Sequence, residues 1–171
     1  MGSWTARAIL ICLTALLLVS SLYLGYIQEI PLDEARNIYS ENSNYIKGLI
    51  VPGDAESTAL NLFIDFSPVV LGCNTPFLGP AVAFFVSYYS GYSLKAEYIV
   101  TGKDVFSASL LDPVSILQLV ALAVAGGEGM FLSYVVWKRQ RADLFETLAV
   151  IFLEISLAVL AATIQAFQAM F

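Results

Sequence analysis

The sequence contains no histidine, and it has few charged residues for its length of 171. Without histidine the chain lacks the usual ligand of haem and of imidazole-bound copper or zinc, and it cannot form a Ser-His-Asp or Cys-His catalytic unit. Fourteen acids outnumber eight bases, which leaves no basic surface of the kind that binds nucleic acid. We therefore predict no enzyme activity, no metal or cofactor, and no nucleic-acid partner.

Charged residues make up 13% of the chain and apolar residues 58%. An ordinary soluble domain is about 25% charged and about 45–50% apolar. The apolar excess indicates that most of the chain lies in a lipid bilayer, and it excludes a soluble enzyme or a disordered tail. Cys12 and Cys73 both lie in apolar sequence, where cysteine is usually a small hydrophobic residue.

Five apolar runs predict an all-α polytopic membrane helix bundle with about five transmembrane helices. A helix of about 20 residues crosses the hydrocarbon core of a bilayer. The predicted spans are residues 8–27, 57–73, 77–94, 113–137 and 144–171, which make 1–171 a single transmembrane domain. The second and third spans are short and contain prolines and glycines, so we expect a broken hairpin that is either kinked or re-entrant.

The connecting segments predict the orientation in the membrane. Lys138, Arg139 and Arg141 cluster between the last two runs, and the positive-inside rule marks that loop as cytoplasmic. Five crossings then place the N-terminus in the cytoplasm and the C-terminus outside. Segment 28–56 becomes external, and its apolar residues recur at helical spacing. That pattern predicts a short amphipathic helix on the membrane surface, as either a packed loop helix or a docking surface.

Three acids, Asp65, Glu128 and Glu154, lie at membrane depth, and no lysine or arginine lies inside any of the five runs. A charged carboxylate at the bilayer centre costs about 2.5–3.5 kcal/mol on insertion scales, so each acid must be protonated, bound to a cation or hydrogen-bonded. Helical spacing places Asn61 beside Asp65, and Gln165 on the face of Glu154. We predict that these five residues line a polar interior, as either a structural hydrogen-bonded cluster or a cation or proton path.

Small residues recur every four positions in two of the runs. Residues four apart share a helix face, and small faces let helices approach closely in lipid. The two candidate helix-packing faces are Gly79, Ala83, Ser87 and Gly91, and Ala121, Ala125, Gly129 and Ser133. They serve either packing within the bundle or association with another membrane protein or a second copy of the chain.

Short motifs follow one another along nearly the whole chain. The first span ends in Gly25-Tyr26, Asn61 opens the second, residues 76–80 form a Gly/Pro turn, and Tyr-Ser-Gly stands at 89–91. Asp-Pro at 112–113 opens the fourth span, which continues to Glu128 and to Phe-Leu-Ser-Tyr at 131–134. Their order and spacing resemble the stage II sporulation protein M family of small polytopic prokaryotic membrane proteins. The chain departs from the family in having one asparagine where two are usual, and Ala-Gly-Gly at 125–127 where a proline-histidine pair is common.

The resemblance implies a multi-pass protein of the prokaryotic cell membrane without known catalytic residues. The namesake of the family anchors an engulfment complex and recruits peptidoglycan-remodelling partners. We predict a non-enzymatic scaffold or accessory subunit of a larger membrane complex, with the lipid bilayer and other membrane subunits or further copies of the chain as partners. The alternative is a small cation or proton channel or transporter that uses the intramembrane carboxylates.

Overall fold

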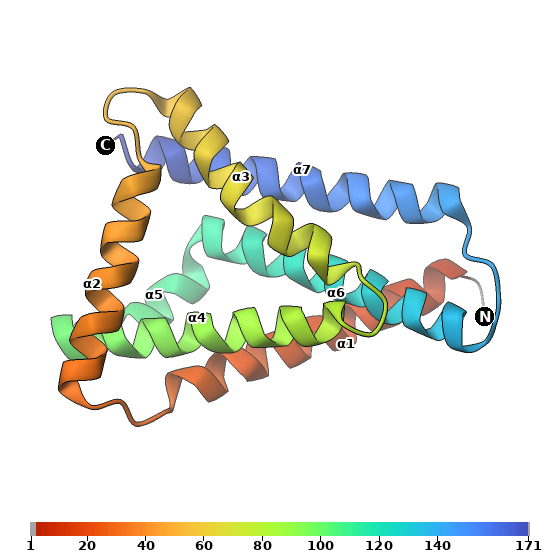
Figure 1. Ribbon diagram of the computed structural model, residues 1–171, viewed down its shortest axis with the longest axis horizontal. Helices are drawn as coiled ribbons and strands as arrows, with labels where there is room; N and C mark the ends of the chain where they lie inside the picture. The colour runs from red at the N-terminus through yellow and green to blue at the C-terminus, as the bar shows by residue number, and fades with distance from the viewer. Residues whose placement is uncertain (1–2, 171) are drawn as a thin grey trace.

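The computed structural model describes residues 3–170, and these residues form seven helices and no strand (Figure 1). The helices are α1 (Ser3–Tyr26), α2 (Leu32–Leu49), α3 (Ala55–Cys73), α4 (Gly79–Thr101), α5 (Val105–Leu111), α6 (Pro113–Trp137) and α7 (Leu144–Gln168). Four long helices, α1, α4, α6 and α7, follow the long axis of the molecule, and α2 crosses one end of them (Figure 1). The predicted all-α architecture is confirmed.

Among the described residues, three helices and not five are long and apolar enough to cross a membrane. They are α1, α6 and α7, with mean hydropathies of 2.3, 1.8 and 2.3. The prediction of five spans is wrong for α3 and α4, although these helices have 19 and 23 residues. Their polar residues, such as Asn61 and Asp65 in α3 and Lys95 and Glu97 in α4, lower the apolar character that a span requires.

Helix α3 begins at a side-chain cap, which is a local signal in the sequence. Asp54 accepts hydrogen bonds from the hydroxyl of Ser57 at 2.6 Å and from its backbone N–H at 3.0 Å. These two bonds, the one from the hydroxyl first, hold the pKa of Asp54 below its ordinary value of 3.8. Helix α6 begins in the same way with Asp112 as its cap and Pro113 as its first residue, and it covers 113–137 as predicted.

Helices α3 and α4 form the predicted hairpin, joined by residues 74–78, but neither helix is interrupted. Pro68 lies inside α3 without ending it. Helix α4 also continues past the predicted end at residue 94, as far as Thr101. It stops at Gly102, whose φ of +70° is the left-handed conformation that glycine adopts without strain. The predicted interruption of the two helices is therefore absent from residues 55–73 and 79–101.

Helices α1 and α4 approach each other closely. A Cβ atom added at Gly91 would lie 1.9 Å from the carbonyl oxygen of Leu22, and one added at Gly25 would lie 2.0 Å from that of Tyr88. The two backbones thus touch at a pair of glycines, because no side chain fits between them. The main apolar core continues from this contact, and its buried members are Leu18, Val70, Cys73, Ala83, Ala121, Leu122, Ala123 and Ala125.

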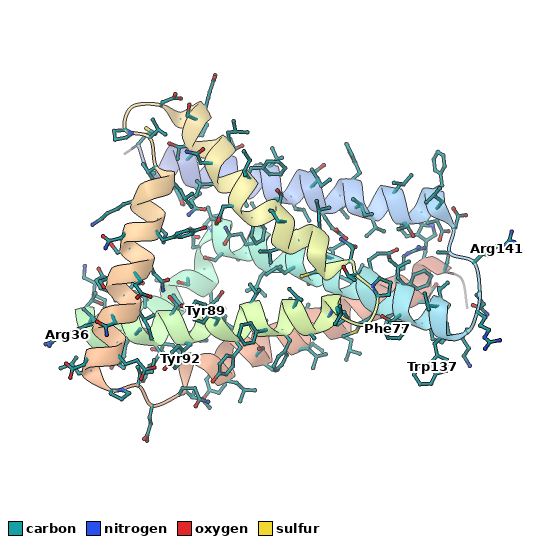
Figure 2. All side chains as sticks on the ribbon, in the orientation of Figure 1. Arg36, Phe77, Tyr89, Tyr92, Trp137 and Arg141 are labelled. Carbon is teal, nitrogen blue, oxygen red and sulfur yellow. The ribbon has the colours of Figure 1, made fainter. Side chains whose placement is uncertain are left out.

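Segment 28–56 contains the predicted helix, α2, which spans Leu32–Leu49. Its buried residue Ala35 packs with Ile30 against Ala96 of α4. The hydroxyl of Tyr92, which points toward α2 in Figure 2, donates a hydrogen bond of 2.8 Å to Glu34. Helix α2 is therefore fixed to α4 by an apolar contact and by a polar one.

Candidate functional site

A cavity of about 740 Å³ lies beneath α2, between α2, α3, α4, α5 and α6. We call it the α2 cavity. Its volume falls in the range of small-molecule sites, about 300–1,000 Å³. Four of these helices contribute hydroxyl groups, namely those of Tyr39, Ser43, Ser87, Ser90, Ser93, Ser109 and Ser115. Leu22, Phe66, Val69, Val86 and Leu122 supply apolar surface. The cavity therefore offers both hydrogen-bonding groups and apolar contact to an occupant.

Asp65 lines the α2 cavity, and its carboxylate has a partner on α2. The hydroxyl of Tyr45 donates a hydrogen bond to Asp65. This bond raises the pKa of Tyr45, because a neutral hydroxyl is needed to donate it. A second bond, from the side-chain amide of Asn42 to the hydroxyl of Ser93, joins α2 to α4. These two bonds hold α2 over the cavity.

At the other end of the bundle, Arg7 of α1 forms a buried network with two acids. Its Nε lies 2.7 Å from Oε2 of Glu128, and its Nη2 lies 3.2 Å from Oε1. Arg7 also donates to Glu146, and the hydroxyl of Thr147 donates to Glu128 at 2.9 Å. The guanidinium lies over the ring of Phe131, 4.0 Å from its centroid. Arg7 is 1% exposed and Glu128 0%, so the pair is fully removed from solvent.

The expectation that the acids at membrane depth have no cationic partner is therefore wrong for Glu128. Arg7 stands one residue before the predicted run 8–27, but α1 begins at Ser3 and includes it. It is 121 residues from Glu128 in sequence, so no local pattern connects them. Glu146, the third member of the network, was also missed. The sequence signal that could have indicated this network is Arg7 itself, a lone arginine immediately before the chargeless apolar run 8–27.

A second buried pair joins the end of α3 to the middle of α7. The side-chain amide of Asn74 donates to Oε2 of Glu154 at 2.5 Å and to the carbonyl of Val70 at 3.3 Å. Glu154 is 0% exposed and Asn74 is 9% exposed. The remaining oxygens, Oε1 of Glu154 and Oδ1 of Asn74, have no hydrogen-bond partner. Sequence reasoning missed Asn74, which looked like an ordinary turn residue between two apolar runs.

The five residues predicted to line one polar interior are distributed over several places. Asn61 donates to the carbonyl of Leu49 at 3.1 Å, and Gln165 is half-buried on α7. Within residues 3–170, no side-chain hydrogen bond joins any two of the five. Asp65 bonds to α2, Glu128 to α1 and α7, and Glu154 to the turn after α3. Each acid thus has its own partners on other elements of the chain.

The two faces of small residues lie inside the bundle. All four on α4 are buried, as are Ala121, Ala125 and Gly129 on α6, while Ser133 is half-buried. The hydroxyl of Ser87 donates to the carbonyl of Leu18 on α1 at 2.8 Å. A Cβ at Gly129 would lie 2.3 Å from the carbonyl oxygen of Cys73 on α3. These faces bring helices of the same chain together.

Comparisons with family models, curated proteins and solved structures find no match to this chain. The resemblance to the stage II sporulation protein M family therefore stays a prediction.

Proposed function

We propose that this chain is a non-enzymatic scaffold or accessory subunit of a larger complex in a prokaryotic cell membrane. One observation carries the proposal, namely the buried network in which Arg7 joins α1 to Glu128 of α6 and Glu146 of α7. In this network the charge of Glu128 is neutralised by a fixed side chain of the same protein. A carboxylate held in this way serves the architecture of a bundle rather than the passage of an ion.

The energetics of buried ion pairs support this interpretation. Removing one partner of such a pair typically costs about 3–5 kcal/mol, because the other charge is left uncompensated. A conducting carboxylate must instead exchange its partner during each cycle. Asp65 is also engaged, by the hydroxyl of Tyr45. Asp65 and Glu128 therefore each have ties that hold helices together, as Glu154 does through Asn74.

A partner subunit would meet the outer surface of the bundle, because the small-residue faces are used inside it. Helix α7 presents large apolar side chains outward. Leu144 is 72% exposed, Phe145 86% and Phe152 73%. Side chains of this kind contact lipid tails or the helix of another membrane protein. We propose the outer face of α7, defined by these three residues, as the docking surface.

We also propose that the N-terminus and the loop 138–143 are cytoplasmic and that α2 and the C-terminus are external. The start of α1 and this loop lie at one end of the bundle, and α2 crosses the other end (Figure 1). Lys138, Arg139 and Arg141 are all exposed in the loop, and Trp137 and Arg141 project from that end (Figure 2). Basic loops are typical of the cytoplasmic side of a membrane protein, and tryptophans are enriched at both membrane interfaces.

The proposal is tested by extracting the tagged protein from its native membrane in a mild detergent and analysing its size and partners. We expect a stable complex that contains a second membrane protein. The double variant Phe145→Ser and Phe152→Ser should release that partner. Leu16→Ser, at a position on α1 that is 68% exposed, is the matched control and should keep the partner bound. A chain that is always extracted alone contradicts the scaffold proposal.

The alternative, a small cation or proton channel or transporter, is favoured by the α2 cavity with Asp65 in its lining and by the buried Glu154. Its test is cation or proton flux into liposomes that contain purified wild type, Asp65→Asn, Glu128→Gln or Glu154→Gln. Each substitution keeps the shape of the side chain and removes its ionisable proton. Wild-type flux well above that of empty liposomes, lost in any one variant, would favour transport over the scaffold.

A further inference from the structure

Two oxygen atoms at the contact between α3 and α7 are buried and lack a hydrogen-bond donor. They are Oε1 of Glu154 and Oδ1 of Asn74. The two side chains are already joined through their other atoms, since Nδ2 of Asn74 donates to Oε2 of Glu154 at 2.5 Å. Buried acceptors are almost always satisfied in folded proteins, and an unsatisfied pair points to a donor that protein heavy atoms do not account for.

The surroundings of Glu154 supply no positive charge. Helix α7 packs against α3 and α6. The titratable groups that face Glu154 from these helices are the thiol of Cys73 and the carboxylate of Glu128, and the latter is paired with Arg7. No lysine or arginine within residues 3–170 forms a salt bridge with Glu154. An ionised Glu154 would therefore be an uncompensated charge in an apolar interior.

The missing partner of these two oxygens must be a bound cation, a water molecule or a proton. The number of free oxygens nearby distinguishes among these three possibilities. The carbonyls of residues 70–72 at the end of α3 already accept hydrogen bonds from the side chain of Asn74 and from the backbone of residues 74 and 75. A hard metal cation requires about six oxygen ligands. The described residues contain no group of three Cys, Asp or Glu side chains placed to hold a metal ion. A water molecule would leave the charge of Glu154 in place, whereas a proton removes the charge and supplies a donor.

We propose that the Glu154–Asn74 pair is a proton-binding site, in which Glu154 is a neutral carboxylic acid at neutral pH. The proton is on Oε1 of Glu154, and this hydroxyl donates a hydrogen bond to Oδ1 of Asn74. The other carboxyl oxygen, Oε2, accepts a hydrogen bond from the side-chain amide of Asn74. Loss of this proton places a negative charge between α3 and α7 and weakens their contact. The inference is independent of the scaffold proposal, because it concerns the protonation of one side chain and not the partner of the chain.

The experiment is infrared spectroscopy of the purified full chain at neutral pH, in a detergent without ester groups. A protonated carboxyl has a carbonyl stretching band that is separate from those of carboxylates and amides. We expect this band in the wild type and its loss in Glu154→Gln. Asp65→Asn removes an acid of α3 that lies outside this pair and should keep the band. Asn74→Ala should keep the band but shift its frequency, because a hydrogen bond to the acid is removed.

Three results would overturn the proposal. The first is a wild-type spectrum without the band, and the second is a band that persists unchanged in Glu154→Gln. The third is a band whose frequency is unchanged in Asn74→Ala. This variant decides the question if Glu154→Gln does not fold. A parallel measurement tests the cation. A wild-type unfolding temperature that rises with sodium at constant ionic strength, without the infrared band, would assign the site to a cation instead.

Discussion

Replacing Arg7 with methionine should destabilise the bundle by about 3–5 kcal/mol, the usual cost of removing one partner from a buried ion pair. A loss of stability of this size is at the upper end of what single substitutions cause. Glu128 is 0% exposed and receives two of its hydrogen bonds from Arg7, at 2.7 and 3.2 Å. Only the hydroxyl of Thr147 would still donate to it. Methionine replaces the apolar stem of arginine and lacks the guanidinium, so the lost charge dominates the result.

The second half of the test removes the other charge. Glu128→Gln alone should also destabilise the protein, because it leaves the guanidinium of Arg7 with Glu146 as its only acidic partner. In the double variant Arg7→Met with Glu128→Gln the fully buried carboxylate is gone as well, and only Glu146, whose side chain is 20% exposed, is left without Arg7. The double variant should therefore cost clearly less than the sum of the two single variants. The difference is the coupling energy of the pair, which contacting residues show and independent sites do not.

The measurement is reversible unfolding of the purified variants in mixed detergent micelles, monitored by the loss of helical circular dichroism. Arg141→Met is the matched control, because Arg141 is exposed in the loop after α6. Its effect should stay within about 0.5 kcal/mol, as for most surface substitutions. The reasoning would be refuted if Arg7→Met cost less than about 1 kcal/mol, or if the cycle gave no coupling energy. Either result would mean that Glu128 is neutral or hydrated and not held by Arg7.

Three further predictions test the orientation, the helix contacts and a helix cap. Cysteines placed at Ser43 and Gln140 should be labelled from opposite sides of the membrane, and labelling of both from one side would contradict the proposed orientation. Gly91→Ala should lower the unfolding temperature strongly, because its Cβ would lie 1.9 Å from a carbonyl oxygen of α1, whereas Gly72→Ala meets no atom within 4 Å and should not. Asp54 has a lowered pKa, so its stabilisation of α3 is present above pH 3.8 and is lost as the pH falls through the lowered value. In the wild type, amide hydrogen exchange in the first turn of α3, corrected for intrinsic rates, should accelerate as the pH falls through this value. In Asp54→Asn the exchange should show no such pH dependence.

The positions of most helices could be predicted from the sequence because their signals are local. Helix α6 covers the predicted 113–137, since Asp112 caps it, Pro113 starts it and an apolar run fills it. Helix α7 begins at the predicted Leu144, and α2 lies within the predicted segment 28–56. Each of these signals acts over one or two helical turns. The number of apolar spans was harder to predict, because α3 and α4 combine sufficient length with polar residues.

The partners of the polar residues were decided only by the tertiary structure. Arg7 and Glu128 are 121 residues apart, and Asn74 and Glu154 are 80 residues apart. A four-residue spacing of small side chains indicates that a helix face is packed, but it does not identify the opposite helix. That choice depends on how all the helices fit together, and here it set Gly91 of α4 against α1. The same fit brought the start of α1 beside α6 and α7, where Arg7 could neutralise an acid that looked unpaired in the sequence.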